Sequence, residues 1–497
     1  MQIITPWQSK IKQLKKLIQR ILELENISKE LEPPEFKRNE YLQQIQNYAN
    51  RFINDIEISK AYSDEKVKQG VLSINGNKKP LSKLIQAYAN EVAGKGINAA
   101  SGGHIGYIPG GGIYTSAIAD FLAAVTNEYA GLYYASPGAV VIENEILNWM
   151  KSIFGFPENA AGSLTSGGSI ANLIALTAAR DHHQIKTDKI SNSIVYLSPQ
   201  AHHCINKALK IIGLEDVIIR YIDLDKYSRI DVNKLNKQIN KDKRNAFNPF
   251  LIIATAGTTD TGAVDPLMEI GKIAQKNKLW YHIDAAYGGF FILTKQKKEL
   301  FRGISMADSL VTDPHKGLFI PYGTGAVLVK NKEAVLHSHQ YTANYMQDSK
   351  YIISNIYDPA DVSPELTRHF RALRIWLPLQ IHGMEPFIAC LEEKLLLTSY
   401  FRSKLLEIGF KTGPTPDLSI SYFWYPSKKV DENAFNKKLL ELIHKEGNIF
   451  FSSTIIDKKF VIRMAILSFR TKLRTIDKAI EIINNARLKL EKDFNYT

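Results

Sequence analysis

The chain has 497 residues, of which 45% are hydrophobic and 23% charged, a composition typical of a globular protein of two or three domains. Its formal net charge is +13, but the basic residues are scattered, and no basic block interleaved with glycine or aromatic residues points to nucleic-acid binding. The two cysteines, Cys204 and Cys390, exclude a disulfide framework, and no run of about 18 apolar residues suggests a membrane span. With no signal-peptide pattern at the start, these features predict a soluble cytoplasmic protein without a membrane partner.

Residues 1–95 are predicted to form an N-terminal helical segment. Apolar residues recur at a spacing of three to four between Ile11 and Leu24, which indicates an amphipathic helix. The stretch "LEPPEF" ends this helix, and two further helical patterns follow it. The apolar stripe is either a dimerisation arm or a face packed on its own chain, and the pattern does not separate the two.

Residues 96–375 are predicted to form a large α/β domain, and residues 376–497 a small α+β domain. In the first region short apolar runs alternate with helical patterns, which indicates a mainly parallel sheet with helices on both faces. The predicted strands of this sheet are residues 193–197, 217–222, 250–255, 279–283, 310–312 and 326–329. The second region is predicted to contain strands at 419–424 and 460–466 and a charged final helix at 476–492.

Polar residues follow four of the predicted strands, at the edge where an open parallel sheet binds its ligands. These strand ends read "SPQAHH", "TAGTT", "DAAYGG" and "DPHK". Any one of them is weak evidence, because a single lysine or histidine is most often a surface residue or a helix-terminal polar group. Together, an imidazole (His202), a carboxylate (Asp284) and an amine (Lys316) at one sheet edge predict a reactive site.

The stretch "TSGGSIANLIAL" places Gly168 and Ser169 at the start of an apolar helix, where free N–H groups suit a phosphate. The alternative is an ordinary helix cap by serine after a glycine turn. A phosphate cradle, a carboxylate, an imidazole and a lysine are the groups that pyridoxal phosphate needs, since the lysine binds its aldehyde covalently and the carboxylate keeps the pyridine nitrogen protonated. No metal is expected.

The sequence resembles the group II pyridoxal-phosphate-dependent amino acid decarboxylases, which include the aromatic-L-amino-acid and glutamate decarboxylases. The resemblance covers roughly residues 95–480. It is carried by the motifs "GYIPGGG", "TSGGSIANLIAL", "YHIDAAYGG", "ADSLVTDPHKG", "RHFRALRIWL" and "FVIRMAILSFRT". It implies the type I fold of the aspartate-aminotransferase kind and a homodimer with the active site at the subunit interface.

The resemblance also implies a role for each matching residue. Lys316 would carry the cofactor, Asp284 would pair with its pyridinium nitrogen and His202 would stack on its ring. Arg463 and Tyr107 would contact the substrate, although an internal salt bridge is the alternative role for Arg463. Further cofactor contacts are implied for Gly168, Ser169, Thr259, Ala286 and His315.

A loop tyrosine, often from the partner subunit, is implied as the donor that protonates the α-carbon. Residues 344–366 offer Tyr345, Tyr351 and Tyr357, and Tyr357 is favoured. The catalytic set expected is therefore Lys316, His202, Asp284 and Tyr357. One departure concerns Asp313, where some relatives have asparagine; because a carboxylate beside a phosphate is unfavourable, Asp313 is expected to point elsewhere.

The expected reaction is decarboxylation of an L-amino acid to the corresponding amine and carbon dioxide. The substrate hypothesis is an aromatic amino acid, because Tyr107, Tyr133 and Tyr134 could line an apolar pocket, although they could equally be core or interface residues. The alternatives are an acidic or other amino acid, a carbon–carbon lyase or aminotransferase on the same scaffold, or a binding protein that has lost catalysis.

Overall fold

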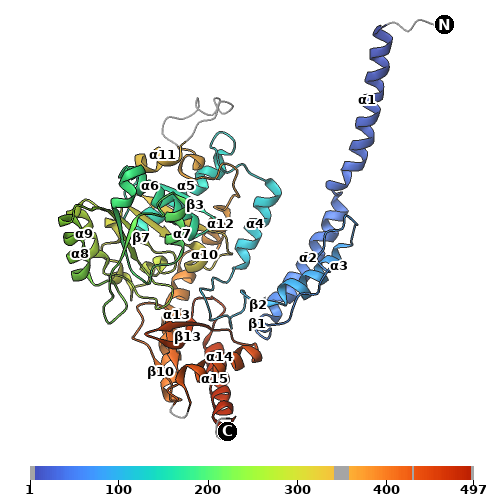
Figure 1. The fold of residues 1–497 in the computed structure, drawn as a ribbon. Coiled ribbons are helices and arrows are strands. Elements are labelled where there is room, and N and C mark those ends of the chain that lie inside the picture. Colours follow the sequence, from blue (N-terminus) through green and yellow to red (C-terminus); the bar gives the residue numbers. More distant parts are fainter. Residues whose placement is uncertain (1–5, 341–356, 428–429, 494–497) are drawn as a thin grey trace. The chain divides into compact units, whose positions relative to one another are not determined.

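The computed structural model describes residues 6–340, 357–427 and 430–493, and the chain divides into two compact units (Figure 1). The first unit comprises residues 1–58 and 65–95, and the second comprises residues 59–64 and 96–497. The second unit contains a large seven-stranded sheet, a smaller four-stranded sheet and a two-stranded ladder. The domain boundaries expected after residues 95 and 375 stay predictions.

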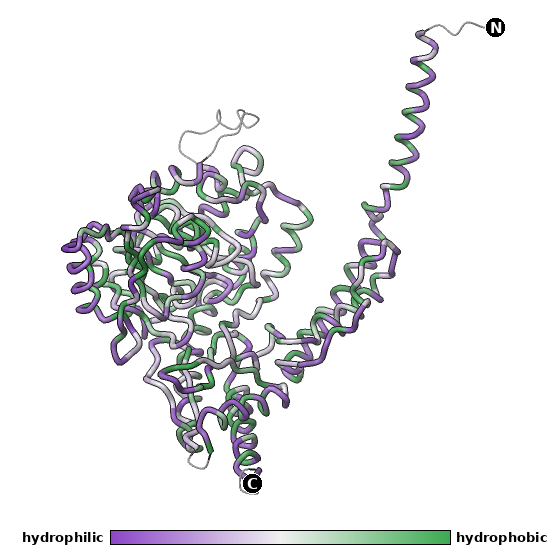
Figure 2. Tube along the Cα trace, viewed as in Figure 1, coloured by the Kyte–Doolittle hydropathy of each residue, from purple (hydrophilic) through white to green (hydrophobic). Residues whose placement is uncertain are grey.

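The first unit is helical in its described part. It contains α1 (Pro6–Ser28), the short 3-10 helix η1 (Lys29–Leu31), α2 (Glu35–Asp55), α3 (Leu81–Tyr88) and the π-helical turn η2 (Ala89–Ala93). Hydrophobic and hydrophilic residues alternate along α1 (Figure 2). This helix has no buried residue, and Leu14 and Leu17 on its apolar stripe are each 57% exposed.

The large sheet of the second unit has seven strands in the order β3-β9-β8-β7-β6-β4-β5. Neighbouring strands from β8 to β5 run parallel, whereas β9 is antiparallel to both β3 and β8. The predicted α/β class is therefore confirmed. The strands are β3 (Ala161–Thr165), β4 (Ser193–Leu197), β5 (Ile218–Tyr221), β6 (Asn248–Thr255), β7 (Trp280–Asp284), β8 (Ser309–Thr312) and β9 (Gly325–Val329).

Strand β3 is absent from the sequence-based prediction. Its sequence, "AGSLT", contains two small residues and no apolar β-branched residue, so it lacks the composition that marks a strand. All five of its residues are buried, and its register is fixed by pairing with β9, a strand that lies 160 residues further along the chain. Tertiary pairing therefore creates this strand where local preference does not.

Both faces of the large sheet are covered, as the long apolar runs predict. Along β6, Ile252 belongs to one hydrophobic cluster while Leu251 and Ile253 belong to the other, because successive side chains of a strand point to opposite faces. Helices surround the sheet (Figure 1). They are α4 (Tyr114–Thr126), α5 (Pro137–Phe154), α6 (Gly168–His182), α7 (Cys204–Ile211), α8 (Val232–Arg244), α9 (Leu267–Asn277), α11 (Lys332–His339) and α12 (Leu373–His382).

A second, antiparallel sheet has the order β10-β11-β13-β12 and shares a hydrophobic cluster with three C-terminal helices. Its strands are β10 (Lys411–Thr412), β11 (Ile420–Trp424), β12 (Ser452–Ile456) and β13 (Lys459–Ala465), and the helices are α13 (Glu385–Glu407), α14 (Glu432–Glu446) and α15 (Leu473–Asp493). A two-stranded ladder pairs β1 (Tyr62–Ser63) with β2 (Gly96–Ile97).

Short helical turns connect these elements. They are η3 (Thr187–Asn192), η4 (Gly289–Leu293), η5 (Lys298–Phe301), η6 (Ile304–Met306), α10 (Pro314–Gly317) and η8 (Pro359–Val362). In the described part of the chain, no helix combines the length and the apolar character that a membrane crossing requires.

Candidate active site

One cavity of about 490 Å³ gathers the residues that the sequence singled out at the strand ends. Its size lies in the range of small-molecule sites. It sits at the carboxyl ends of the parallel strands, where the topology of the sheet brings together segments that are far apart in the chain. Its lining includes Tyr107, Gly168, Ser169, His202, Thr259, Asp284, Ala286, His315, Lys316 and Arg463.

Lys316 lies in α10, the single helical turn that follows β8, and Pro314 begins this turn with its backbone angle already fixed. The Nζ atom of Lys316 is 2.9 Å from Oδ2 of Asp313. Burial acts to lower the pKa of Lys316, but the charge and the hydrogen bond of Asp313 outweigh it, so that the pKa is raised. The amine is thus held as an ammonium group and must lose a proton before it can act as a nucleophile.

The expectation that Asp313 points away from the site is wrong. Its side chain is buried, with Oδ2 on Lys316, while Oδ1 has no hydrogen-bond partner in the described residues. A Cβ atom added to Gly168 would lie 3.0 Å from Oδ2, and one added to Gly325 would lie 2.7 Å from Oδ1. The carboxylate therefore occupies the space between the glycine loop and β9, where its attraction to a buried ammonium offsets the cost of desolvation.

Asp284 ends β7 and is buried at the cavity. Its Oδ1 accepts a hydrogen bond of 3.0 Å from the N–H of Ala286, and its Oδ2 accepts one of 3.4 Å from Nδ2 of Asn172. Burial raises the pKa of this carboxyl group. A cationic ligand atom beside it would restore the ionised form by direct attraction.

Behind Asp284 runs a chain of hydrogen bonds that the sequence analysis missed. His282 contacts Oδ1 of Asn172 through Nε2 at 2.7 Å and Oγ of Ser309 through Nδ1 at 2.8 Å, and Nε1 of Trp280 donates to that same Oγ at 2.8 Å. Burial lowers the pKa of His282 to about 3, so the ring is neutral. The signal in the sequence was "YHID", because residues two apart on a strand share one face.

Only one set of proton positions satisfies this chain. Because Nδ2 of Asn172 donates to Asp284, its Oδ1 must accept, and His282 therefore carries its proton on Nε2. Nδ1 of His282 then accepts from the hydroxyl of Ser309, whose oxygen accepts from the indole of Trp280. The result is a fixed N–H donor aimed at the carboxylate of Asp284.

The glycine loop before α6 is shaped by its own backbone. Gly167 has φ of +152°, a conformation that side-chain-bearing residues rarely adopt, and the hydroxyl of Thr165 both donates to the carbonyl of Gly167 and accepts from its N–H. Gly167 is the N-cap of α6, and no side chain caps this helix, so the alternative of a serine cap is wrong. The first N–H groups of a helix have no partner inside it, and Gly168 and Ser169, the first two residues of α6, line the cavity.

His202 and Arg463 reach the cavity from different parts of the unit. Nδ1 of His202 accepts a hydrogen bond from the N–H of Cys204 at the start of α7, and burial lowers the pKa of this imidazole. Arg463 on β13 donates to the carbonyl oxygens of Thr259 at 2.8 Å and Tyr107 at 3.0 Å. Arg463 also donates to Oγ of Ser452 and forms no direct ion pair among the described residues, although the nearby charge of Asp260 acts to raise its pKa against the effect of burial.

The residues of this cavity fit pyridoxal phosphate. They supply a buried amine, a buried carboxylate with a fixed donor behind it, an imidazole, and a glycine cradle that a Cβ atom at Gly168 would partly fill. Ala286 adds a small side chain next to Asp284, which leaves space for a flat ring. Asp313 is the one feature at odds with an anionic phosphate.

Comparison with known proteins decides the family. Residues 72–410 match the model of the pyridoxal-dependent decarboxylase conserved domain. This chain belongs to the pyridoxal-dependent decarboxylase family. It is a pyridoxal-phosphate-dependent amino acid decarboxylase, as the sequence motifs predicted.

Among its relatives, the aromatic-L-amino-acid decarboxylase of Bacillus atrophaeus is 35% identical over 393 residues, which cover 78% of this chain and 81% of that protein. Tryptophan decarboxylase 2 of Oryza sativa subsp. japonica is 28% identical over 401 residues, covering 78% and 81% of the two chains. The crystal structure of Catharanthus roseus tryptophan decarboxylase in complex with L-tryptophan has the same fold, with a TM-score of 0.85 at 20% identity over 92% of this chain and 99% of that one.

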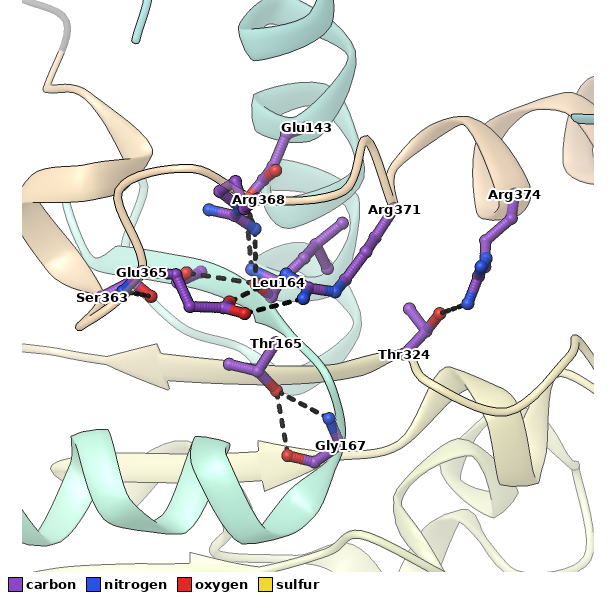
Figure 3. A network of polar contacts seen from close by, with 11 residues as sticks. Glu143, Leu164, Thr165, Gly167, Thr324, Ser363, Glu365, Arg368, Arg371 and Arg374 are labelled. Carbon is purple, nitrogen blue, oxygen red and sulfur yellow. Dashed lines mark hydrogen bonds and ion pairs between the residues drawn. The ribbon is translucent and has the colours of Figure 1, made fainter. Parts of the chain in front are cut away.

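The motif "RHFRALRIWL" of this decarboxylase is a set of arginine anchors behind the cavity (Figure 3). Arg368 pairs with Glu143 at 2.9 Å, and the same carboxylate accepts from the N–H of Leu164 in β3. Arg371 pairs with Glu365 through two hydrogen bonds of 2.8 and 2.9 Å. The motif therefore holds β3 directly before the glycine loop.

The predicted loop tyrosine is not brought to the cavity of its own chain. The hydroxyl oxygen of Tyr357 accepts a hydrogen bond of 3.1 Å from the N–H of Gly162 in β3, and its ring lies 4.9 Å from Nζ of Lys332. Tyr345 and Tyr351 lie outside the described residues. The role of Tyr357 as proton donor stays a prediction, and it requires a second chain.

Of the three tyrosines considered for the substrate pocket, only Tyr107 lines this cavity. Tyr133 is held elsewhere, because its N–H donates to Asp358.

We expect Asp313→Asn to lower the pKa of Lys316, because burial of the amine remains while its ion pair is lost. The measurement is the pH dependence of Lys316 modification by an amine-reactive reagent in the cofactor-free protein, followed by mass spectrometry. The exposed lysines in the same digest serve as the control, since their profiles should not move. An unchanged profile for Lys316 would show that Asp313 does not set the charge of the amine.

We expect His282→Phe to lower the free energy of unfolding by about 1–3 kcal/mol, because the buried Oδ1 of Asn172 and hydroxyl of Ser309 lose their partner. It should also weaken the binding of pyridoxal phosphate, since the donor to Asp284 is no longer fixed. Denaturant unfolding and cofactor titration measure the two effects. His337→Phe, at an exposed position of α11, is the control and should change neither.

Proposed function

We propose that this decarboxylase acts on an aromatic L-amino acid and that the residues of the described cavity carry the reaction. The observation that carries the proposal is the lining of a single cavity by Lys316, Asp284 and Arg463, with the guanidinium group of Arg463 held by backbone carbonyl oxygens. The similarity to an aromatic-L-amino-acid decarboxylase at 35% identity supports the same substrate class.

The proposed cofactor contacts follow the positions of the lining residues. Bound pyridoxal phosphate supplies a conjugated ring that accepts the electrons of the bond broken when carbon dioxide leaves. Lys316 provides the amine that attaches it, Asp284 holds a proton at the pyridine nitrogen, and His202 packs against the ring. Gly168 and Ser169 would bind the phosphate. Ala286 would lie against the ring, and Thr259 would lie near its phenolic oxygen. His315 would approach both cofactor and substrate.

Arg463 is assigned to the substrate carboxylate. Its guanidinium group is buried, and two of its hydrogen bonds go to the backbone carbonyls of Thr259 and Tyr107, which fix its position. The charge of Asp260 acts on Arg463, but no direct ion pair between the two is formed, so the planar fork of the buried guanidinium group can still take a carboxylate. Because Arg463 is bonded to the backbone of Tyr107, the position of the substrate carboxylate is linked to the part of the cavity that receives the substrate side chain.

An aromatic side chain suits the remainder of the lining better than an acidic one. Tyr107 and Ile108 supply apolar surface, whereas Asp260 and Asp313 add carboxylates. A glutamate or aspartate side chain would require a second cation, and in the described lining the lysine and arginine side chains are Lys316 and Arg463 alone. Both are already assigned to the cofactor and the α-carboxylate.

We propose that the active form is a cytoplasmic homodimer. The support is the apolar stripe of α1, which has no buried residue in the chain and could be covered by a second copy. Both cysteines are free, as a reducing compartment would require. In this dimer Tyr357 would act at the active site of the partner.

We expect Lys316→Ala to abolish the covalent attachment of pyridoxal phosphate and reduce decarboxylation by about 10³-fold or more. The wild-type protein should gain the mass of the cofactor after borohydride treatment, and the variant should not. Lys295→Ala, at a residue outside the cavity lining, is the control and should behave like the wild type. A wild-type protein that takes up no cofactor mass would overturn the assignment.

We expect carbon dioxide release from tryptophan, tyrosine or phenylalanine in a screen of the twenty amino acids. With the best of these substrates, we expect the Arg463→Lys variant to lose about tenfold or more in kcat/KM. Arg402→Lys is a matched control, because Arg402 also bonds a backbone carbonyl and a serine in the same region but does not line the cavity. Release from glutamate or aspartate alone would exclude the aromatic substrate while leaving the reaction type intact.

A further inference from the structure

Arg374 is the third arginine of the "RHFRALRIWL" motif and lies near the start of α12. Its Nε donates to Oδ1 of Asp120 in α4 at 2.8 Å, and its Nη1 donates to the carbonyl oxygen of Tyr322 at 2.9 Å and to Oγ1 of Thr324 at 3.2 Å. Figure 3 shows Arg374 reaching Thr324 from the helix. One guanidinium group thus connects α4 and α12 to the turn at residues 321–324. Arg368 and Arg371 make other contacts and do not bind this turn.

The turn that Arg374 holds is shaped to receive it. Gly323 has φ of +95°, and a Cβ atom added there would lie 3.2 Å from Nη1 of Arg374. Both the backbone conformation and the close approach therefore favour glycine at this position. The turn leads directly into β9, so its position is fixed on one side by the sheet and on the other by Arg374.

The same turn fixes His315, a residue of the cavity lining. The carbonyl oxygen of Thr324 lies 2.6 Å from Nδ1 of His315 and also accepts from the N–H of His315 at 3.3 Å. A carbonyl oxygen can only accept, so the proton of the neutral ring is on Nδ1. Nε2 then carries the lone pair, 3.8 Å from Oδ2 of Asp313. The ring of Tyr322 lies edge-on at 5.7 Å between centroids.

The charge state of His315 is set by its burial and by the charged groups around it. Burial lowers the pKa of His315, the ammonium of Lys316 and the guanidinium of Arg374 lower it further, and Asp313 and the carbonyl of Thr324 act in the opposite direction. The net result is a lowered pKa. Arg374 therefore acts on His315 in two ways. It holds the turn whose carbonyl oxygen accepts the hydrogen bond of Nδ1, and its positive charge lowers the pKa of the ring.

We propose that Arg374, held by Asp120, is a positioning residue that fixes His315 as a neutral ring with its proton on Nδ1 and its lone pair on Nε2. The importance of His315 for catalysis rests on the proposed function. The assignment of its tautomer rests only on its hydrogen bonds and holds without that function. Disturbing Arg374 should release the turn and let the imidazole exchange tautomers or take up a proton. Arg374 does this without lining the cavity itself.

The test is histidine-selective nitrogen-15 NMR of the full-length protein, with and without pyridoxal phosphate, with the signals of His315 assigned by a His315→Gln variant. In the wild type, Nδ1 should show the shift of a protonated ring nitrogen and Nε2 that of an unprotonated one across neutral pH. In Arg374→Met the two tautomers should mix, and the pKa of His315 should rise. In Arg374→Lys the charge remains but the fork is lost, so the tautomers should mix with little change in pKa.

Arg371→Lys is the matched control, because Arg371 anchors the same motif through Glu365 but makes no hydrogen bond to the turn. It should leave the signals of His315 at their wild-type positions. If decarboxylation requires a neutral His315, the acid limb of the kcat/KM profile should move to higher pH in Arg374→Met, with a loss of about tenfold at neutral pH. The control should retain the wild-type profile.

Wild-type nitrogen shifts and titration of His315 in a folded Arg374→Met protein would overturn the inference, even if activity falls. If this variant does not fold, Asp120→Asn decides the question. It removes the counter-ion of Arg374 and should therefore lower the pKa of His315 further. An unchanged titration of His315 would count against the proposal. A protein that releases no carbon dioxide from any amino acid would refute the proposed function while leaving the NMR result interpretable.

Discussion

The ion pair between Lys316 and Asp313 is the interaction on which the site depends. A buried carboxylate meets a partly buried ammonium group at the carboxyl edge of the sheet, and each offsets the desolvation of the other. The pair places the amine in the cavity and keeps it charged until a ligand carbonyl competes for it. Asp313 also brings a negative charge to the glycine cradle.

The groups that line the cavity are held by polar contacts one layer behind them. Asn172, His282 and Ser309 direct a donor at Asp284, and the arginines of the "RHFRALRIWL" motif hold β3 and the turn at residues 321–324. The contacts of Asn172 with Asp284 and His282 and that of Arg368 with Glu143 are buried, so breaking one of them leaves a polar group without a partner. Rigid support of this kind keeps reactive groups within the small tolerances that catalysis allows.

Much of the site could be predicted from the sequence, because the reactive groups follow strands. His202, Asp284 and Lys316 come directly after apolar runs, and parallel strands place their carboxyl ends at one edge. The other strands of the large sheet were predicted within one or two residues, whereas β3, whose small residues carry no strand preference, was missed, as were β10 and β12 of the small sheet and the short β1 and β2. The hydrogen-bond chain behind Asp284 was not predicted, because its members come from α6, β7 and β8 and share no local pattern.

The sequence by itself determined the α/β class, the cofactor and the family, because apolar periodicity and motif spacing are local properties that the chain carries before it folds. Only the tertiary structure decided the direction of Asp313, the carbonyl partners of Arg463, the contact of Tyr357 with β3 and the tautomer of His315. Each of these depends on which distant side chain or carbonyl lies within hydrogen-bond distance. That distance is set by packing of the whole unit, which no local stretch of residues encodes.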